Sequence, residues 1–375
     1  MLNVLHVHSG NLYGGVETFL LTLARCREMS PSVQMSAALC FEGRIASEFR
    51  DENIPTTMLG EVRLRRPDSV WRARQALAAI LNEGRFDAVI CHQAWPLAIF
   101  GSVVKTAGLP LIEWLHMAQT GSHWLDRLAS RVQPDCYICN SDFTASVLPK
   151  TAARVETIYP PVMPKQPNKG GRSRNMVRDE FETRADDVVV IQVSRMEPLK
   201  GQSDCIAALA GLRDQPGWVC WQVGGAQRAA DAKYMESLRR DVERHGLSER
   251  VRFLGERSDV GDLLSAADLF CQPNRAPDAF GISFVEALSA GLPVVTTSIG
   301  GAREIVDSTC GILVQPDDHE ALSAALSRLI LARTEREELG RLGPRRAAFL
   351  CDPATQMAKI AATLQSVCSR YEALQ

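Results

Sequence analysis

The chain has 375 residues, of which 46% are hydrophobic and 23% are charged. That length exceeds one ordinary domain and predicts about two. The formal net charge of −2 gives no basic excess for binding nucleic acid. Mixed charges without low-complexity tracts predict a folded chain rather than a disordered one.

Targeting and cysteine patterns favour a cytoplasmic chain. The first residues, MLNVLHVHSG, lack the basic start and long apolar stretch of a secretory signal, and apolar windows such as 95–104 are too short to span a membrane. One CxxC spacing occurs among the eleven cysteines, at Cys136 and Cys139. In a strand these two side chains point to opposite faces, so they predict core packing rather than a zinc site. An odd number of thiols without a secretion signal is typical of a reducing compartment.

The first half of the chain alternates short apolar runs with longer segments whose apolar residues recur every three or four positions. The short runs predict strands at 2–9, 33–40, 56–59, 87–93, 111–117, 136–140 and 155–160. The longer segments predict helices at 16–29, 44–52, 69–84, 96–108, 123–132 and 141–148. This alternation predicts a parallel sheet with helices on both faces.

The pattern breaks between residues 160 and 175, which have the Pro-, Gly- and Arg/Lys-rich composition of a linker. After this break, strands are predicted at 188–194, 218–225, 251–255, 268–274, 293–298 and 311–315. Helices are predicted at 202–212, 234–246, 260–267, 282–291, 301–307 and 319–332. The expected organisation is a first domain at 1–163, a linker at 164–175, a second domain at 176–352 and an amphipathic helix at 353–375.

Strand-to-helix turns are the places where ligands bind in such sheets. Gly14 and Gly15 follow the first strand and allow a ligand to approach the backbone, although an ordinary tight turn explains them more simply. Arg195 and Lys200 follow the first strand of the second domain, where two cations beside a helix start suit a diphosphate. The alternative for this pair is two solvated surface charges.

A third turn carries two carboxylates eight residues apart. A helix begins at 280–282, and its free amides can meet an anion. Asp278 lies before this helix, and Glu286 lies one turn inside it with its side chain leaning toward the N-terminus. Both acids can then face one pocket, one holding sugar hydroxyls and the other a ribose. The alternative is an acid that favours the helix dipole, followed by a solvated Glu.

These motifs occur together in one known family. GGVET, CNSDFTA, SRMEPLKG, VRFLG and DAFGISFVEALSAGLPVV, the last followed by GGAREIV, stand in the family's order over nearly the whole chain. The chain resembles the retaining glycosyltransferases of family four. The resemblance implies the GT-B fold: an α/β chain with two Rossmann-like doubly wound domains facing a central cleft. It also implies a nucleotide-sugar donor on the second domain, an acceptor on the first, and a C-terminal helix at 353–375 that returns to the first domain.

The resemblance assigns roles to single residues in the donor site. Arg195 and Lys200 fall where the family binds the donor diphosphate, and Glu286 falls where a Glu holds the ribose. The loop with Gly14 and Gly15 lies close to that diphosphate. The helix start formed by Phe280, Gly281 and Ile282 is expected to bind the donor as well.

Two further positions concern the transferred sugar. His116, at a strand end, matches an active-site His near the donor sugar, whereas His6, His8 and His92 keep a structural interpretation. Asp278 stands where the family usually has Glu. Its reach is shorter by about 1.5 Å, the length of one C–C bond. This departure leaves the contact with the sugar hydroxyls open.

The implied reaction moves a sugar, with retention of configuration, from a UDP- or GDP-sugar to a glycan or glycolipid acceptor in bacterial polysaccharide or glycoconjugate assembly. Arg195, Lys200 and the helix start would stabilise the departing nucleoside diphosphate. This can replace a divalent metal, so neither a metal nor a cofactor is expected. The alternatives are a sugar-nucleotide epimerase or hydrolase that needs no acceptor, and a non-catalytic nucleotide-sugar-binding module.

A basic segment at 61–77 concerns possible contact of the protein with a membrane. It combines Trp71 with five arginines, Arg63, Arg65, Arg66, Arg72 and Arg74. Such a segment can touch anionic lipid if the acceptor is lipid-linked, at the inner face of the membrane. A solvated helix face beside a basic loop is the simpler interpretation. The sequence defines neither the donor base and sugar nor the acceptor, the linkage or the oligomeric state.

Overall fold

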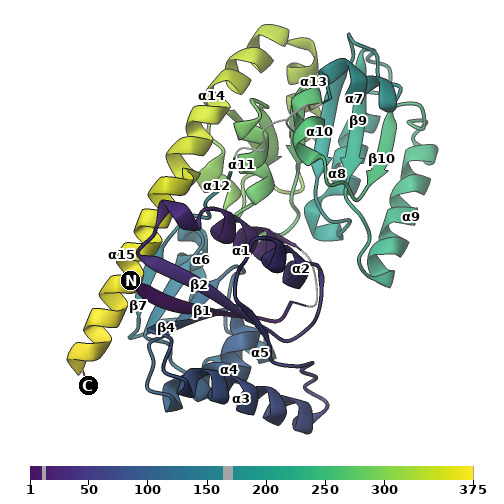
Figure 1. Cartoon of the computed structure of the whole chain (residues 1–375). Helices are drawn as coiled ribbons and strands as arrows, with labels where there is room; N and C mark the ends of the chain where they lie inside the picture. Colours follow the sequence, from purple (N-terminus) through teal and green to yellow (C-terminus); the bar gives the residue numbers. More distant parts are fainter. Residues whose placement is uncertain (11–13, 164–171, 375) are drawn as a thin grey trace. The chain divides into compact units, whose positions relative to one another are not determined.

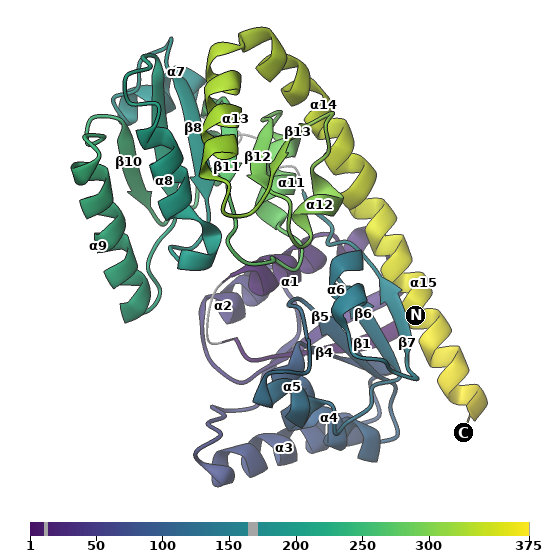
Figure 2. The same cartoon turned by 180° about the vertical axis from the view of Figure 1, so that it is seen from behind.

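The computed structural model describes residues 1–10, 14–163 and 172–374 and divides the chain into two compact units (Figures 1 and 2). The first unit comprises Met1–Val162 and Cys351–Gln375, and the second comprises Met163–Leu350. Most of the predicted linker, at 164–171, lies outside the described residues. Its last two residues, Arg174 and Asn175, begin helix α7 (Arg174–Glu180).

The first unit is built on a seven-stranded parallel sheet in the order β3-β2-β1-β4-β5-β6-β7. Its strands are β1 (Leu2–His8), β2 (Val33–Leu39), β3 (Thr56–Met58), β4 (Ala88–His92), β5 (Leu111–Leu115), β6 (Cys136–Cys139) and β7 (Arg154–Thr157). Its helices are α1 (Gly15–Arg25), α2 (Arg44–Asp51), α3 (Pro67–Asn82), α4 (Ala94–Thr106), α5 (Trp124–Ala129) and α6 (Asp142–Val147), with a 3₁₀ turn at Arg27–Met29. The strand order reverses between β1 and β4.

The second unit has a six-stranded parallel sheet in the order β10-β9-β8-β11-β12-β13. Its strands are β8 (Val188–Val193), β9 (Trp218–Val223), β10 (Val251–Gly255), β11 (Leu269–Gln272), β12 (Val294–Thr297) and β13 (Gly311–Val314). After α7 its helices are α8 (Gln202–Ala210), α9 (Ala229–Arg244), α10 (Val260–Ala266), α11 (Ile282–Ser289), α12 (Ala302–Ile305), α13 (His319–Leu331) and α14 (Arg333–Cys351). The order reverses between β8 and β11. The prediction of two Rossmann-like doubly wound domains is thereby confirmed.

The strands are readable from the sequence because the sheets are covered on both faces. Every residue of β4, β5 and β9 is buried, which is why these strands appear as apolar runs with one polar residue each, His92, Glu113 and Gln222. Cys136 and Cys139 are both buried in β6, and all eleven cysteines are free thiols.

The C-terminal helix α15 (Pro353–Leu374) packs on the first unit, as the resemblance implies. It runs alongside β7 in both views (Figures 1 and 2). Arg154 of β7 donates a 2.6 Å hydrogen bond to the Ser366 hydroxyl, and the Cys368 thiol lies 3.6 Å from the Asp87 carbonyl oxygen. The backbone amide of Val162 bonds to the carbonyl of Cys351 at 3.0 Å. The helix therefore joins a unit whose sheet ends almost 200 residues earlier in the chain.

A buried arginine anchors α7 to the sheet of the second unit. The Arg178 guanidinium, almost fully buried, lies 2.5 Å from the Asp268 carboxylate and donates to the carbonyls of Ala266, Arg184 and Asp187. Asp268 also accepts the Val189 amide of β8 at 2.8 Å. One ion pair thus joins α7, the loop after α10 and the first strand of the sheet.

Replacing this arginine should destabilise the second unit. Arg178→Leu leaves Asp268 with the more exposed Arg174 as its arginine partner and takes the donor from several carbonyls, and we expect a loss of about 3 kcal/mol in the free energy of unfolding. Hydrogen exchange of the β8 and β11 amides measures this loss. The matched control is Arg184, whose exposed guanidinium pairs with the exposed Asp186 carboxylate. Equal protection losses in Arg178→Leu and Arg184→Leu would contradict the assignment.

Candidate functional site

The turn between β8 and α8 presents Arg195 and Lys200 at the carboxyl edge of the second sheet. Two buried amide side chains hold this turn by its backbone. Gln202 donates to the Arg195 carbonyl at 2.8 Å and to the Ser194 hydroxyl at 3.0 Å, and Gln192 donates to the Lys200 carbonyl at 2.8 Å. Because these amides hold the backbone, the turn keeps its shape without using either cationic side chain.

Gly201 allows this turn to lie against the next strand end. Its φ of +69° is in the left-handed region, and a Cβ there would overlap the carbonyl oxygen of Pro273 after β11. The amide of Arg275, in the same segment after β11, donates to the Leu199 carbonyl at 3.0 Å. The turns after β8 and β11 are therefore in direct backbone contact.

This contact brings Lys200 together with Asp278. The Lys200 ammonium nitrogen lies 2.5 Å from the Asp278 carboxylate, although the two residues are 78 positions apart. Arg195 instead pairs with Glu197 at 3.0 Å, a partner that the sequence analysis did not identify. Lys200 and Asp278, both predicted site residues, are thus in contact. Arg195 instead has an acidic partner within its own turn.

The segment around Asp278 is held by the turn before α12. The Asp278 carbonyl accepts the Gly301 amide at 2.9 Å, and Cβ atoms on Gly300 or Gly301 would overlap the backbone at 278–280. Gly281 caps α11 with a φ of +109°, and Ile282 begins the helix. Phe280 is buried in the core, so its backbone rather than its ring is at the site. Glu286 lies on α11, partly exposed, one turn beyond Gly281.

Sequence reasoning missed the buried amides that support the site. Gln192, Gln222 and Gln272 occupy the ends of β8, β9 and β11 in otherwise apolar strands, and each is almost fully buried. The Gln222 amide reaches the Gln192 oxygen at 3.4 Å. A signal existed in the sequence, because VVVIQV, WVCWQV and LFCQ each carry one Gln near the end of the strand.

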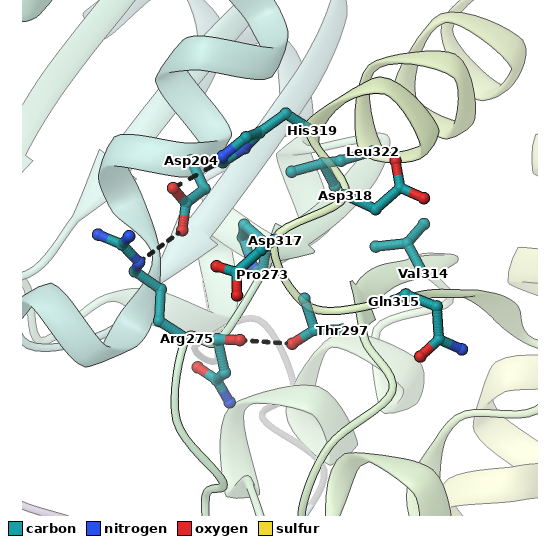
Figure 3. A pocket seen from close by; sticks show the side chains of 11 residues that line it. Asp204, Pro273, Arg275, Thr297, Val314, Gln315, Asp317, Asp318, His319 and Leu322 are labelled. Atoms are coloured by element: carbon teal, nitrogen blue, oxygen red, sulfur yellow. Dashed lines mark hydrogen bonds and ion pairs between the residues drawn. The ribbon is translucent and has the colours of Figure 1, made fainter.

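A shallow pocket lies beside the turn after β11 and the start of α13 (Figure 3). Arg275 and His319 point toward Asp204 at the start of α8, at 3.3 and 3.9 Å. Burial raises the pKa of the Asp204 carboxyl, and the charge of Arg275 opposes this. These contacts join α8 and α13 to the turn after β11.

In the first unit, His116 follows β5 and is joined to two other histidines. Its Nε2 lies 2.9 Å from Nδ1 of His92, and the Nε2 of His92 lies 2.9 Å from Nδ1 of His6. Burial lowers the pKa of His6 to about 4 and that of His116 to about 3, so both rings are neutral at pH 7. The structural interpretation of His6 and His92 is thus incomplete, because they form one row with the predicted site residue.

The Gly14–Gly15 turn is tied to another histidine. Glu17 on α1 accepts the Gly14 amide at 2.8 Å and lies 2.7 Å from Nε2 of His8. Gly15 begins α1, and a Cβ there would meet no atom of the described residues within 4 Å. Packing among these residues therefore gives no reason for Gly15, and its proximity to a diphosphate stays a prediction.

Glu113 in β5 is a buried carboxyl close to His116 in the chain. Burial raises its pKa to about 8, and the Gln119 side-chain amide donates to it at 2.5 Å. The bond holds the segment that follows His116 against the sheet. At neutral pH the Glu113 carboxyl is mainly protonated, so the core contains no unpaired negative charge at this position.

Comparison with known proteins identifies the chain. The family model described as "Glycosyl transferases group 1" matches residues 173–346, and the model described as "Glycosyltransferase Family 4" matches residues 13–166. The chain is therefore a glycosyltransferase, an enzyme class that moves a sugar from a donor to an acceptor. It belongs to glycosyltransferase family four and has the GT-B fold, which confirms the resemblance seen in the motifs.

Named relatives and solved structures agree with this assignment. A GDP-mannose-dependent alpha-(1-6)-phosphatidylinositol monomannoside mannosyltransferase of Mycolicibacterium smegmatis is 28% identical over 86% of both chains. A phosphatidyl-myo-inositol mannosyltransferase of Mycobacterium leprae is 35% identical over 38% of this chain and 36% of that protein. The crystal structure of Anabaena Alr3699/HepE with UDP and glucose has a TM-score of 0.84 and 25% identity, and the match covers 98% of this chain and 100% of that one.

The described residues contain neither a membrane-spanning helix nor a cluster of metal ligands. No helix among residues 1–10, 14–163 and 172–374 is both long and apolar enough to cross a membrane. Within the same residues, no group of three or more His, Cys, Asp or Glu side chains is placed to hold a metal ion. Independence from metal stays a prediction.

The close approach at Gly201 can be tested against a glycine with the same backbone angle. Gly246 has a φ of +68° but open space at its Cβ position. Both Gly201→Ala and Gly246→Ala carry the left-handed cost of about 1–2 kcal/mol, and only Gly201→Ala also forces the turns after β8 and β11 apart. We expect its Tm to fall several degrees further than that of Gly246→Ala, and equal Tm values would contradict the contact.

The buried Glu113 should make stability depend on pH. Between its ordinary value of 4.5 and about 8, the folded state holds a proton that the unfolded state has lost, so stability falls as pH rises through this window. The buried histidines have the opposite effect on stability. Below pH 6.5 their rings are protonated in the unfolded state but stay neutral in the folded state, so stability rises with pH there. Glu113→Gln should reduce the loss of Tm between pH 6 and 8, whereas exposed Glu83→Gln should keep the wild-type profile. An unchanged profile in Glu113→Gln would show that this carboxyl is ionised in the folded protein.

Proposed function

We propose that this glycosyltransferase moves a hexose from a UDP- or GDP-sugar to a glycolipid or lipid-linked glycan and retains the configuration at the anomeric carbon. The observation that carries the proposal is the Lys200–Asp278 pair at the start of α11, with Arg195 in the adjoining turn. This arrangement has the charges that a nucleoside diphosphate and a sugar need: cations for phosphate and a carboxylate for hydroxyl groups.

The chemistry follows from the departing group. Negative charge grows on the nucleoside diphosphate as the bond to the sugar breaks, and Arg195, Lys200 and the free amides at Gly281 would stabilise it without a metal. In the proposal Glu286 holds the ribose, Asp278 holds sugar hydroxyls, and Gly14 and Gly15 let the chain approach the diphosphate. The leaving phosphate would help to deprotonate the acceptor on the face it has just left, which gives retention.

Relatives support both the donor and the acceptor class. The Mycolicibacterium relative is named as GDP-mannose-dependent and acts on a phosphatidylinositol monomannoside, and Anabaena Alr3699/HepE has been solved with UDP-glucose. The proposal therefore keeps UDP- and GDP-sugars as donors. It places the acceptor on the first unit, where His116 would contact the sugar or the acceptor.

A lipid-linked acceptor gives a role to the exposed part of α3. Trp71 is 63% exposed there, beside a basic segment. Arg63 pairs with Glu61, and both Arg66 and Arg72 pair with Asp68, so part of the positive charge is neutralised locally. We infer a weak peripheral contact with anionic lipid from the cytoplasmic side. Liposomes that contain anionic lipid should retain the wild type more than Trp71→Ser at low salt; equal retention would remove this part of the proposal.

The test of the charge-stabilising role uses Lys200→Met, with exposed Lys233→Met as control. Each protein is supplied with UDP- and GDP-sugars and a lipid extract, with EDTA present. We expect Lys200→Met to lower kcat by about 100-fold or more and Lys233→Met to leave it unchanged. Released nucleoside diphosphate measures turnover, and NMR of the product gives the anomeric configuration.

The same assay separates the alternatives. Inversion at the anomeric carbon would overturn retention, and normal turnover in Lys200→Met would overturn the role of the cation. Donor consumption in the absence of acceptor would point to an epimerase or hydrolase. Activity that EDTA abolishes and Mg²⁺ restores would overturn independence from metal.

A further inference from the structure

Three histidines lie in a diagonal row across neighbouring strands of the first sheet. In the parallel register His6 of β1 pairs with Ile90 of β4, and His92 of β4 pairs with Trp114 of β5. Each next histidine therefore lies two residues beyond the direct partner of the one before. An offset of two keeps the side chains on the same face of the sheet, so the row is a consequence of the strand order.

The rings are joined edge to edge. Neighbouring centroids are 5.2 Å apart in both pairs, and the ring planes differ by only 13° and 25°. Both pairs have a nitrogen–nitrogen distance of 2.9 Å. This geometry is that of two hydrogen bonds between nearly coplanar imidazoles, because stacked faces would bring the centroids closer and leave the nitrogens unpaired. Phe19 packs beside the row, 4.8 Å from the His116 ring.

The two hydrogen bonds couple the tautomers of the three rings. A neutral imidazole has one N–H donor and one bare acceptor nitrogen. Each bond joins Nδ1 of one ring to Nε2 of the next, so all three rings must carry their proton on the same kind of nitrogen. Burial keeps the rings neutral, since it lowers the pKa of His6 to about 4, that of His116 to about 3 and that of His92 well below its ordinary value.

The row leaves His116 one ring nitrogen for a ligand. Its Nε2 is bonded to His92, so Nδ1 is the atom that can meet a hydroxyl group. When the protons lie on Nδ1 throughout the row, that atom is a donor. When they lie on Nε2, it is an acceptor, and His6 carries the corresponding proton at the far end.

We propose that His92 is a positioning residue, which with His6 fixes the ring orientation and the tautomer of His116 for contact with a substrate hydroxyl. The inference rests on the proposed function, in which His116 contacts the sugar or the acceptor. If one proton crosses each of the two bonds of the row while Nε2 of His6 takes up a proton and Nδ1 of His116 releases one, His116 changes from donor to acceptor and every ring stays neutral. The tautomer that the three rings share therefore sets whether His116 donates to a hydroxyl or accepts from it.

Packing alone does not account for the row. Apolar side chains at positions 6 and 92 would fill the core without the cost of burying the ring nitrogens of His6 and His92. The imidazoles offset part of that cost only because they bond to one another. Their arrangement is thus a specific polar network that ends at the predicted site residue.

Two substitutions of His92 separate its two bonds. An Asn amide reaches about the position of Nδ1 and can keep the bond to His116, whereas a Gln amide reaches about the position of Nε2 and keeps the bond to His6 instead. We expect His92→Gln to lower kcat by about tenfold to 100-fold, because a small misplacement of a contacting group is costly. His92→Asn should lose much less, and donor KM should stay near the wild-type value in both.

The matched control is His245→Gln at the end of α9 in the second unit, outside the row. It should retain wild-type kcat. Melting temperatures of all variants show whether activity simply follows stability. Equal losses of kcat in His92→Gln and His92→Asn, in proportion to their loss of Tm, would reduce His92 to a packing residue and overturn the proposal.

A spectroscopic test is independent of activity. Two-bond ¹H–¹⁵N spectra of the full chain with labelled histidine report the tautomer of each ring, with assignments from single His→Gln variants. Between pH 6 and 8, His6, His92 and His116 should all be neutral and share one tautomer, and His116 should lose its fixed tautomer in His92→Gln. Mixed tautomers or a charged ring at pH 7 would overturn the row. If no donor and acceptor give turnover in the wild type, the proposed function fails, while these spectra still decide the row.

Discussion

Parallel pairing of strands that are distant in the chain is the constraint on which both candidate regions depend. Parallel strands end at the same edge of a sheet, and each sheet reverses its strand order once. In the second unit this reversal makes β11 the neighbour of β8, and Asp278 meets Lys200 for that reason. In the first unit it makes β4 the neighbour of β1, and His92 then reaches His6.

Buried amide side chains hold the backbone of the turn that carries the two cations of the candidate site. Gln192 and Gln202 bind the backbone of the turn that carries Arg195 and Lys200, so neither cation is needed to hold the turn together. Gly201 lets the turn approach Pro273 closely enough for backbone bonding. The first unit uses the same principle, because Glu113 fixes the segment after His116 through Gln119. In both units buried polar residues bond to the segments that carry the predicted site residues and so fix the position of those segments.

The fold was predictable because its signals are local, whereas the partnerships within the site depend on sheet order. Buried strands such as β4 and β5 give mainly apolar runs, which can be recognised in the sequence without knowing which strands lie beside them. The sequence placed Lys200 and Asp278 in turns but could not show that they touch. His6 and His92 were interpreted singly for the same reason, since a row of three requires the order β1-β4-β5. The roles of the site residues in binding and catalysis stay predictions.

Helix α14 was missed for a different physical reason. Its sequence contains Gly340, Gly343 and Pro344, which are typical of a break rather than of a 19-residue helix. Cβ atoms at the two glycines would overlap the carbonyl oxygen of Gly291 or crowd that of Leu288. The glycines are therefore needed for close packing against the end of α11, and this tertiary contact overrides their low helix propensity.

The acid at position 278 is best understood through its partner. The side chains of Lys200 and Asp278 are only 21% and 26% exposed, so the pair is partly shielded from solvent. Holding a Lys side chain in one place costs rotamer entropy. In this pair the entropy is already lost when the protein folds, so it is not lost again when a ligand binds to Lys200. An ammonium group has three donors, so Lys200 can keep its bond to Asp278 and still offer two to a phosphate. The carboxylate of Asp278 thus holds the Lys200 ammonium group in one position, whereas its contact with sugar hydroxyls stays a prediction.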